Sequence, residues 1–173
     1  MNTAIGRRRW GRAGPLLTIL AALAALSSCG SYRELDELAA LDVVLKDMDG
    51  RDVRLADFRG RPLILNFWAS WCEPCQREMP QLVALSKRFG PEGLTILGIS
   101  VDDPVAEVQA FARAFSIDYP LLVGRGRDEV LAGLGFRGLM PTTVFINRQG
   151  RITGRLVGPA SDDFFDRTVR ALF

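Results

Sequence analysis

The six residues from Leu63 to Trp68 constrain the fold more than any other stretch of the chain. Their sequence, LILNFW, is apolar at every position except Asn66, so neither face of an extended strand would suit water. A strand of this composition is covered by other elements on both faces. The chain must therefore place helices on both sides of a sheet, which predicts an α/β fold.

The segments on either side alternate between strand and helix patterns. Further strands are expected at 41–46, 53–55, 94–101, 119–123, 142–147 and 151–157. Helices are expected at 72–89, at 102–115 with Asp102, Asp103 and Pro104 as its cap, at 128–134 and at 162–173. Turn residues at 47–50 and 148–150 join neighbouring strands into hairpins. The pattern predicts a mixed sheet flanked by helices, with a β-hairpin near its N-terminus.

The first 28 residues have the pattern of an export signal. Arg7 to Arg9 and Arg12 form a basic start, and an apolar run of eleven residues follows from Leu16 to Leu26, interrupted by Thr18. Eleven residues of helix rise about 16 Å, against roughly 30 Å of hydrocarbon in a bilayer. This run is therefore predicted to be the apolar core of a signal peptide and not a membrane span.

The end of this run, LSSC at Leu26–Cys29, resembles the lipobox of bacterial lipoproteins. The resemblance implies that the chain is cut before Cys29 and that Cys29 carries the lipid. An uncleaved anchor or an ordinary cut nearby is the alternative. The arginine cluster also resembles in part a twin-arginine signal, so the export route is open between that pathway and Sec. Either route ends beyond the cytoplasmic membrane, where stable disulfides form.

Three segments follow from this interpretation. They are a signal peptide at 1–28, a lipid-anchored tether at 29–40 and a single domain at 41–173. Leucines recur at helical spacing at Leu35, Leu38 and Leu41, so part of the tether is expected to be helical.

Composition excludes several kinds of site. The formal charge is +2, and it becomes −2 without the four arginines of the signal, so no nucleic-acid surface is indicated. The absence of histidine excludes Ser-His and Cys-His catalysis and any histidine-ligated zinc, copper or haem. Three cysteines are too few for a Cys₄ zinc site or an all-cysteine iron–sulfur cluster. With Cys29 assigned to lipid, Cys72 and Cys75 remain for each other.

The pair in CEPC, Cys72 and Cys75, lies where a helix is predicted to begin. There the free backbone N–H groups and the helix dipole favour a thiolate at the first cysteine. The second sulfur, one turn on, is close enough to attack a mixed disulfide. Pro74 restricts the backbone between them without removing a needed N–H. Redox chemistry is favoured, because a zinc knuckle lacks two ligands and a structural disulfide here would constrain the unfolded chain little.

The segment NFWASWCEPC, Asn66–Cys75, resembles the active-site strand and helix of the thioredoxin superfamily. It is more closely similar to the TlpA/ResA-like membrane-tethered thiol–disulfide oxidoreductases, and the resemblance extends over 41–173. Pro80, the MPTT loop at 140–143 and the hairpin at 147–151 agree with it. The resemblance implies a thioredoxin fold with an inserted helix and strand between the active-site helix and the MPTT loop.

The resemblance also implies roles for individual residues. Cys72 would be the attacking thiolate and Cys75 the resolving thiol, so the redox-active disulfide between them is the only cofactor expected. Pro141 would follow a cis peptide bond, which turns the Met140 backbone toward an extended client segment that could pair with it as an added strand.

Three further side chains surround the pair. Trp71 is expected to cover Cys72 and to offer a client a contact face, and Trp68 to lie in the core beneath, with ordinary packing as the alternative for both. Glu73 lies between the two sulfurs, where its charge opposes a thiolate at Cys72 and would make the pair a weaker oxidant. The helix N-terminus stabilises the same charge, so the net effect is open.

Proton transfer is assigned to Glu78. Thioredoxin has a buried aspartate on its central strand, but Asn66 stands at that position here and cannot exchange a proton. The TlpA/ResA-like branch has an acidic residue just after the motif, and Glu78 lies one turn beyond Cys75. The hypothesis is that Glu78 takes the Cys75 proton. The alternative is a solvated carboxylate, or a partner of Arg77 or Arg61.

Together these features predict a lipid-anchored, monomeric enzyme of the periplasm or an equivalent space that reduces disulfides of client proteins. Its electrons would come from a membrane thiol–disulfide carrier, and apocytochrome c is the client that the resemblance suggests. The alternatives are a disulfide oxidase or isomerase, a thiol peroxidase, and a protein that binds copper through the two sulfurs and Met140. Leu65 and Ala69 argue against a peroxidase, since that family carries proline and threonine there.

Overall fold

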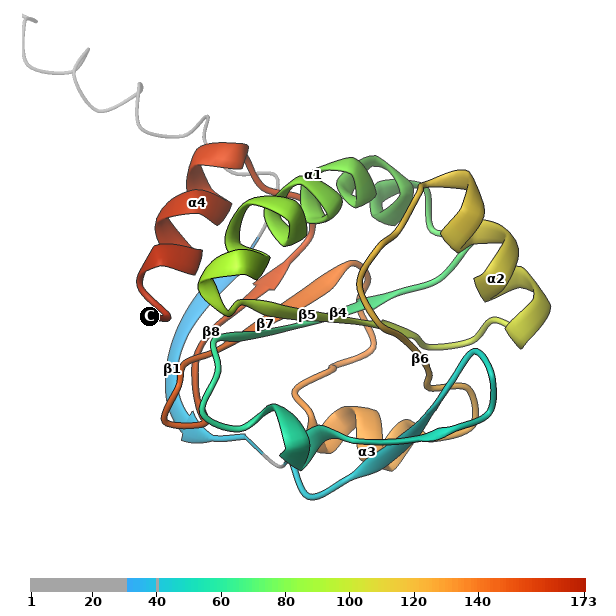
Figure 1. Ribbon diagram of the computed structural model, residues 1–173, viewed down its shortest axis with the longest axis horizontal. Helices are drawn as coiled ribbons and strands as arrows, with labels where there is room; N and C mark the ends of the chain where they lie inside the picture. The colour runs from blue at the N-terminus through green and yellow to red at the C-terminus, as the bar shows by residue number, and fades with distance from the viewer. Residues whose placement is uncertain (1–30, 40) are drawn as a thin grey trace, which may run out of the picture.

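The computed structural model describes residues 31–39 and 41–173, which form one mixed sheet with helices on both of its faces (Figure 1). The strands are β1 (Ser31–Leu38), β2 (Val44–Asp47), β3 (Asp52–Arg54), β4 (Leu63–Trp68), β5 (Thr95–Ser100), β6 (Leu121–Val123), β7 (Thr142–Ile146) and β8 (Arg151–Val157). The helices are α1 (Glu73–Phe89), α2 (Val105–Ala114), α3 (Asp128–Gly133) and α4 (Asp162–Arg170), with the short 3₁₀ helices η1 (Leu55–Phe58) and η2 (Gly90–Glu92).

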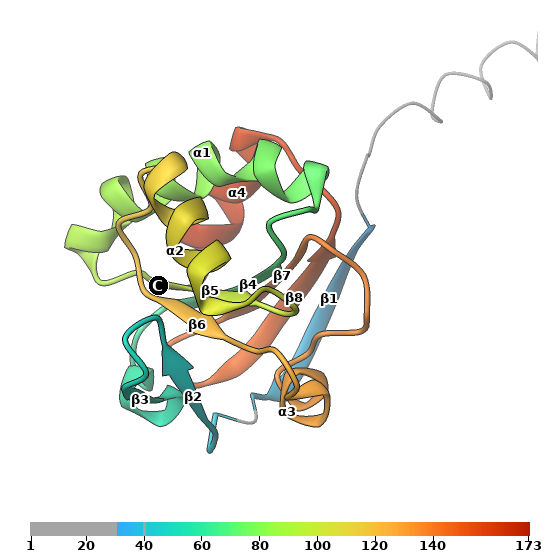
Figure 2. The same ribbon diagram turned by 90° about the vertical axis from the view of Figure 1, so that its right-hand side faces the viewer.

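The sheet has eight strands in the order β1-β8-β7-β4-β5-β6-β2-β3. β4 lies inside it, parallel to β5 and antiparallel to β7, and all six of its residues are buried, as predicted. The β2–β3 hairpin forms one edge of the sheet and β1 the other (Figure 2). The predicted α/β class, the mixed sheet and the N-terminal hairpin are confirmed.

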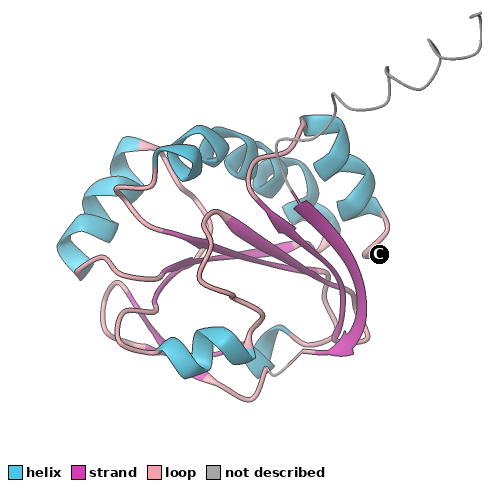
Figure 3. Ribbon diagram, turned by 180° about the vertical axis from the view of Figure 1, so that it is seen from behind, coloured by secondary structure: helices cyan, strands magenta, loops and turns pink. Residues whose placement is uncertain are grey.

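Alternate residues of β4 enter two separate cores. Ile64 and Trp68 join the core beneath α1, α2 and α4, whereas Leu65 and Phe67 join the core on the side of α3 and η1. Figure 3 shows from behind how the longer helices cover one face of the sheet and the short ones the other. Burial on both faces explains why β4 is apolar at every position except Asn66, which lies on the α1 side and needs a hydrogen-bond partner.

Two expectations about local structure are wrong. Ser31–Leu38 is strand β1, paired antiparallel with β8, and not a partly helical segment, so the described part of the expected tether belongs to the sheet. Helix α2 begins at Val105 with Pro104 as its N-cap and no side-chain capping bond, so Asp102 and Asp103 do not cap it. The other predicted strands and helices occur within three residues of the expected bounds.

The predicted signal peptide and Cys29 lie outside the described residues. Among the residues that are described, no helix is both long and apolar enough to cross a membrane.

Candidate active site

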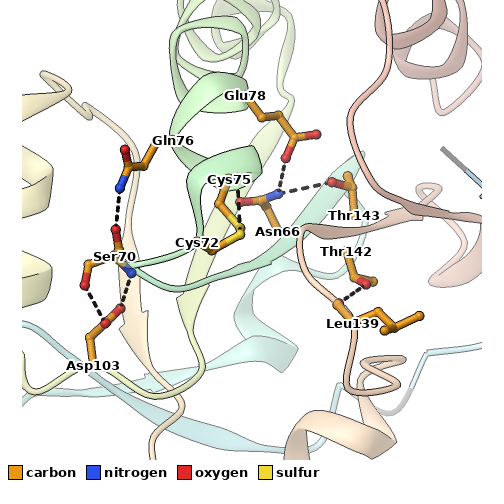
Figure 4. Close-up of a disulfide and its surroundings, with 10 residues drawn as sticks. All are labelled: Asn66, Ser70, Cys72, Cys75, Gln76, Glu78, Asp103, Leu139, Thr142 and Thr143. Carbon is orange, nitrogen blue, oxygen red and sulfur yellow. Dashed lines mark hydrogen bonds between the residues drawn. A yellow bond between two sulfur atoms is a disulfide. The ribbon is translucent and has the colours of Figure 1, made fainter. Parts of the chain in front are cut away.

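The two cysteines lie where β4 passes into α1. Cys72 is the N-cap of α1, and its backbone N–H donates to Ala69 O (3.1 Å), which closes a tight turn after the strand. Cys72 and Cys75 form a disulfide, with their Cα atoms 5.2 Å apart (Figure 4). Cys72 is 7% exposed and Cys75 is 0% exposed, so of the two residues only Cys72 has any surface open to solvent.

The start of α1 favours negative charge on Cys72. The backbone N–H of Cys75 donates to Cys72 Sγ (3.2 Å), and this is one of the N–H groups that a helix leaves without an internal partner. A thiolate at this position would accept the same bond and interact favourably with the helix dipole. Pro74 lies in the first turn, where its missing N–H costs nothing.

Glu78 lies one turn beyond Cys75 and is buried, with 2% of its surface exposed. Burial raises the pKa of its carboxyl group from 4.5 to about 7, although a hydrogen bond from Asn66 acts in the opposite direction. The predicted alternative of a solvated carboxylate is wrong. Arg77 pairs with Glu73 instead, at 2.6 Å, in an exposed ion pair.

Asn66 links the helix carboxyl to the neighbouring strand. Its Nδ2 donates to Glu78 Oε2 (3.2 Å) and to Thr143 Oγ1 on β7 (3.1 Å). Glu78 Oε1 and Asn66 Oδ1 are buried and make no hydrogen bond with the described residues. A protonated Glu78 carboxyl group has an O–H that can donate to an unpaired oxygen such as Asn66 Oδ1, whereas a carboxylate has no donor. This environment therefore favours the neutral form of Glu78.

The loop before β7 packs, through Met140, against the core cluster that contains Cys72 and Cys75. The Met140–Pro141 peptide bond is cis, as the resemblance implied, and Thr142 Oγ1 donates to Leu139 O (2.6 Å). The Leu139 side chain is exposed, and so is Trp71, with 63% of its surface open to solvent. Trp68 is fully buried and stacks on Phe111 at 4.3 Å between ring centroids, which confirms its predicted place in the core.

The sequence interpretation missed a polar anchor on the other side of the pair. Asp103 is buried, and its carboxylate accepts from Ser70 N (2.8 Å), from Ser70 Oγ (2.7 Å) and from Ser100 Oγ (2.7 Å). The Ser70 carbonyl in turn accepts from Gln76 Nε2 (2.7 Å) in α1. The sequence does show an acidic residue, Asp103, between a buried strand and a proline. The sequence interpretation assigned it to the cap of the following helix instead.

The mixed sheet and the cysteine pair at the start of α1 define a class of protein, the thioredoxin-fold thiol–disulfide oxidoreductases. A family model described as the AhpC/TSA family matches residues 37–155. The thiol–disulfide oxidoreductase ResA of Geobacillus thermodenitrificans is 37% identical over 147 residues, covering 83% of each chain. The chain therefore belongs to the AhpC/TSA family and, within it, to the ResA-like thiol–disulfide oxidoreductases.

More distant relatives agree. ResA of Bacillus subtilis is 29% identical and covers 90% of this chain and 88% of its own. Among solved structures, MTB dsbF has a TM-score of 0.70 at 28% identity and covers 77% of this chain and 96% of its own. A thiol:disulfide interchange protein of the thioredoxin family from Chlorobium tepidum TLS has a TM-score of 0.69 at 28% identity, covering 81% and 97%.

The described residues hold no group of three or more His, Cys, Asp or Glu side chains that could bind a metal ion.

Proposed function

We propose that this enzyme reduces disulfides of client proteins, with Cys72 as the attacking thiolate and Cys75 as the resolving thiol. The observation that carries the proposal is the unequal exposure of the two cysteines at the start of α1. Cys72 keeps 7% of its surface exposed and its sulfur accepts a backbone N–H, whereas Cys75 is fully buried. A client disulfide can therefore meet Cys72 alone, and the second sulfur is held back for the intramolecular step.

The reduced enzyme would transfer two electrons in two displacements. The Cys72 thiolate attacks one client sulfur, forms a mixed disulfide and releases the other client sulfur as a thiolate. Cys75 then loses its proton and attacks Cys72 Sγ, which releases the second client sulfur and leaves the Cys72–Cys75 disulfide. The client gains two electrons, and the enzyme is oxidised.

Glu78 is the proposed acceptor of the Cys75 proton. A buried thiol needs a base nearby, and Glu78 follows Cys75 by one turn of the same helix. A pKa of about 7 suits a group that must take up and release a proton near neutral pH. Asn66 holds one carboxyl oxygen, so it orients this base without itself exchanging a proton.

The client would dock across the exposed side chains beside Cys72. Trp71 and Leu139 are large apolar groups open to solvent, and Met140 lies between Leu139 and the buried Pro141. An extended client segment would pair with the Met140 backbone as an added strand and cover these side chains. The charge of Glu73 should oppose the Cys72 thiolate less than its place between the sulfurs suggests, because its carboxylate is exposed, is screened by solvent and pairs with Arg77.

The cellular setting belongs to the same proposal. The enzyme would be exported to the periplasm or an equivalent space, carry lipid on Cys29 and work there as a monomer. It would receive electrons from a membrane thiol–disulfide carrier and reduce the haem-attachment cysteines of apocytochrome c during cytochrome c maturation. The lipobox resemblance and the ResA relatives support these assignments.

The decisive experiment is to trap the mixed disulfide. Cys75→Ser removes the resolving thiol, so clients should accumulate on Cys72, and mass spectrometry of the trapped complex identifies them. Cys72→Ser is the matched control and should trap nothing. Clients trapped equally well by both variants would overturn the assigned order of attack.

The direction of electron flow needs a separate measurement. A reduction potential near that of thioredoxin, about −270 mV, supports a reductase, whereas a value near −120 mV indicates a disulfide oxidase. Fast reduction of hydrogen peroxide by the dithiol form would favour a peroxidase, and tight Cu(I) binding the copper-binding alternative.

A further inference from the structure

The turn that presents Cys72 is held from outside α1 by a buried carboxylate. Ser70 lies two residues before Cys72, between the end of β4 and the start of α1. Its backbone N–H donates to Asp103 Oδ2 (2.8 Å) and its hydroxyl to Asp103 Oδ1 (2.7 Å), so both carboxylate oxygens accept hydrogen bonds from the same residue (Figure 4). The hydroxyl has one proton, so its longer contact with Glu107 Oε2 (3.3 Å) is secondary.

Asp103 is itself fixed by the strand that precedes it. Ser100 Oγ donates to Asp103 Oδ2 (2.7 Å), and the Asp103 backbone N–H donates to Ser100 Oγ (3.3 Å). Nearby, Val101 N–H donates to Trp68 O (2.9 Å), which joins the ends of β5 and β4. Three donors satisfy the buried carboxylate, and it makes no ion pair with the described residues. The loop after β5 therefore holds Asp103 in position to bind Ser70.

The hydrogen bonds between Asp103 and Ser70 affect Cys72 through the backbone of the turn. The Ser70 carbonyl accepts from Gln76 Nε2 (2.7 Å), and Cys72 N–H closes the turn on Ala69 O (3.1 Å). Ser70 is thus tied to the first turn of α1 on one side and to Asp103 on the other. Releasing Ser70 would loosen the turn that holds Cys72 Sγ on the Cys75 N–H.

We propose that Asp103 is a positioning residue for this reaction, which fixes Ser70 and thereby keeps Cys72 Sγ against the helix N-terminus. The inference rests on the proposed role of Cys72 as the attacking thiolate. It gives the loop after β5 a part in the chemistry, although Asp103 touches neither sulfur. If the turn loosens, the thiolate loses part of its hydrogen bond and its dipole contact, so the pKa of Cys72 rises.

The test measures the pKa of Cys72 in the reduced protein from the pH dependence of its alkylation by iodoacetamide, followed at the Cys72 peptide by mass spectrometry. In Asp103→Asn the pKa should rise by about one unit, so alkylation below both pKa values slows about tenfold. Ser70→Ala keeps the backbone bond to Asp103 and should shift the pKa less, in the same direction. The double variant should shift it no further than Asp103→Asn alone, because both changes release the same contact.

Asp102→Asn is the matched control, since it removes an adjacent carboxylate that makes no hydrogen bond or ion pair with the described residues. Its Cys72 should titrate like the wild type. Folded Asp103→Asn and Ser70→Ala proteins with an unchanged pKa would show that Asp103 only stabilises the loop. A lower pKa in Asp103→Asn beside an unchanged Ser70→Ala would show that its charge acts directly, which also overturns the proposal.

Two outcomes remain. If Asp103→Asn does not fold, Ser70→Ala decides alone: a raised pKa supports the proposal and an unchanged one overturns it. A wild-type Cys72 that titrates near 8.5, like a free thiol, would contradict the proposed function itself, whatever the variants do.

Discussion

Replacing Glu78 by glutamine is expected to change how the stability of this protein depends on pH. In the folded protein burial raises the pKa of Glu78 from 4.5 to about 7, whereas in the unfolded chain it keeps its ordinary value. Between these pH values the unfolded chain releases a proton that the folded protein retains. The favourable contribution of the neutral acid is therefore complete below pH 4.5 and is lost as the pH rises through about 7.

The size of the effect follows from the two pKa values. Each pKa unit corresponds to 1.36 kcal/mol, so the interval from 4.5 to about 7 corresponds to about 3 kcal/mol of unfolding free energy. Glutamine has nearly the same shape, cannot ionise, and its amide oxygen can still accept from Asn66. The variant should therefore gain about 3 kcal/mol relative to wild type between pH 4 and pH 8, with no further gain above pH 8.

Urea unfolding of the oxidised proteins from pH 4 to pH 9 would measure this difference, because the disulfide removes thiol titration and the subtraction cancels the other ionisable groups. Glu92→Gln, at an exposed position in η2, is the matched control and should follow the wild-type profile. A difference between Glu78→Gln and wild type that stayed constant across this range would mean that Glu78 ionises as freely folded as unfolded. The argument for a buried proton acceptor would then fail.

Three further predictions concern stability and client binding. Ser161→Ala should cost about 1 kcal/mol in urea unfolding, because Ser161 Oγ accepts from Phe164 N (3.2 Å) at the start of α4; an unchanged stability would contradict the capping role. Gly98→Ala should lower the unfolding free energy by about 1–3 kcal/mol, since a Cβ there would lie 2.4 Å from Leu121 Cδ2 in the core. A wild-type melting temperature would show that Leu121 moves aside freely. Trp71→Ala should leave stability within about 0.5 kcal/mol and raise the KM for a protein disulfide. An unchanged KM would remove Trp71 from the docking surface.

The central strand and the cysteine pair could be predicted because their signals are local. The six consecutive residues of β4 indicate burial on both faces. The Cys-x-x-Cys spacing indicates the start of a helix without any information about the rest of the chain. β1 gave no such signal. Its leucines have helical spacing, and the segment is a strand because it pairs with β8 at the sheet edge, a tertiary interaction that overrides local propensity.

The two buried carboxylates, Glu78 and Asp103, also differ in how much of their role could be predicted from local sequence. The position of Glu78 on α1 was evident from the spacing, but its burial depends on the strands beneath the helix and on the donor that Asn66 supplies. The pattern at Asp102–Pro104 matched a helix cap, since an N-cap and a partner for a distant loop use the same side-chain oxygens. Only the packing of the β4–α1 turn against the end of β5 selects the second role for Asp103.

The site is held by the two strands that flank β4, and this limits where the fold can vary. β5 supplies Ser100 and leads to Asp103, which holds the turn before Cys72, while β7 supplies Thr143, which holds Asn66 beneath Glu78. β6 and α3, which lie between these two strands in sequence, contribute to the core but make none of the hydrogen bonds drawn around the disulfide (Figure 4). Changes within α3 should therefore alter stability without changing the reactivity of Cys72, because the groups that orient its sulfur are anchored on neighbouring strands of the sheet.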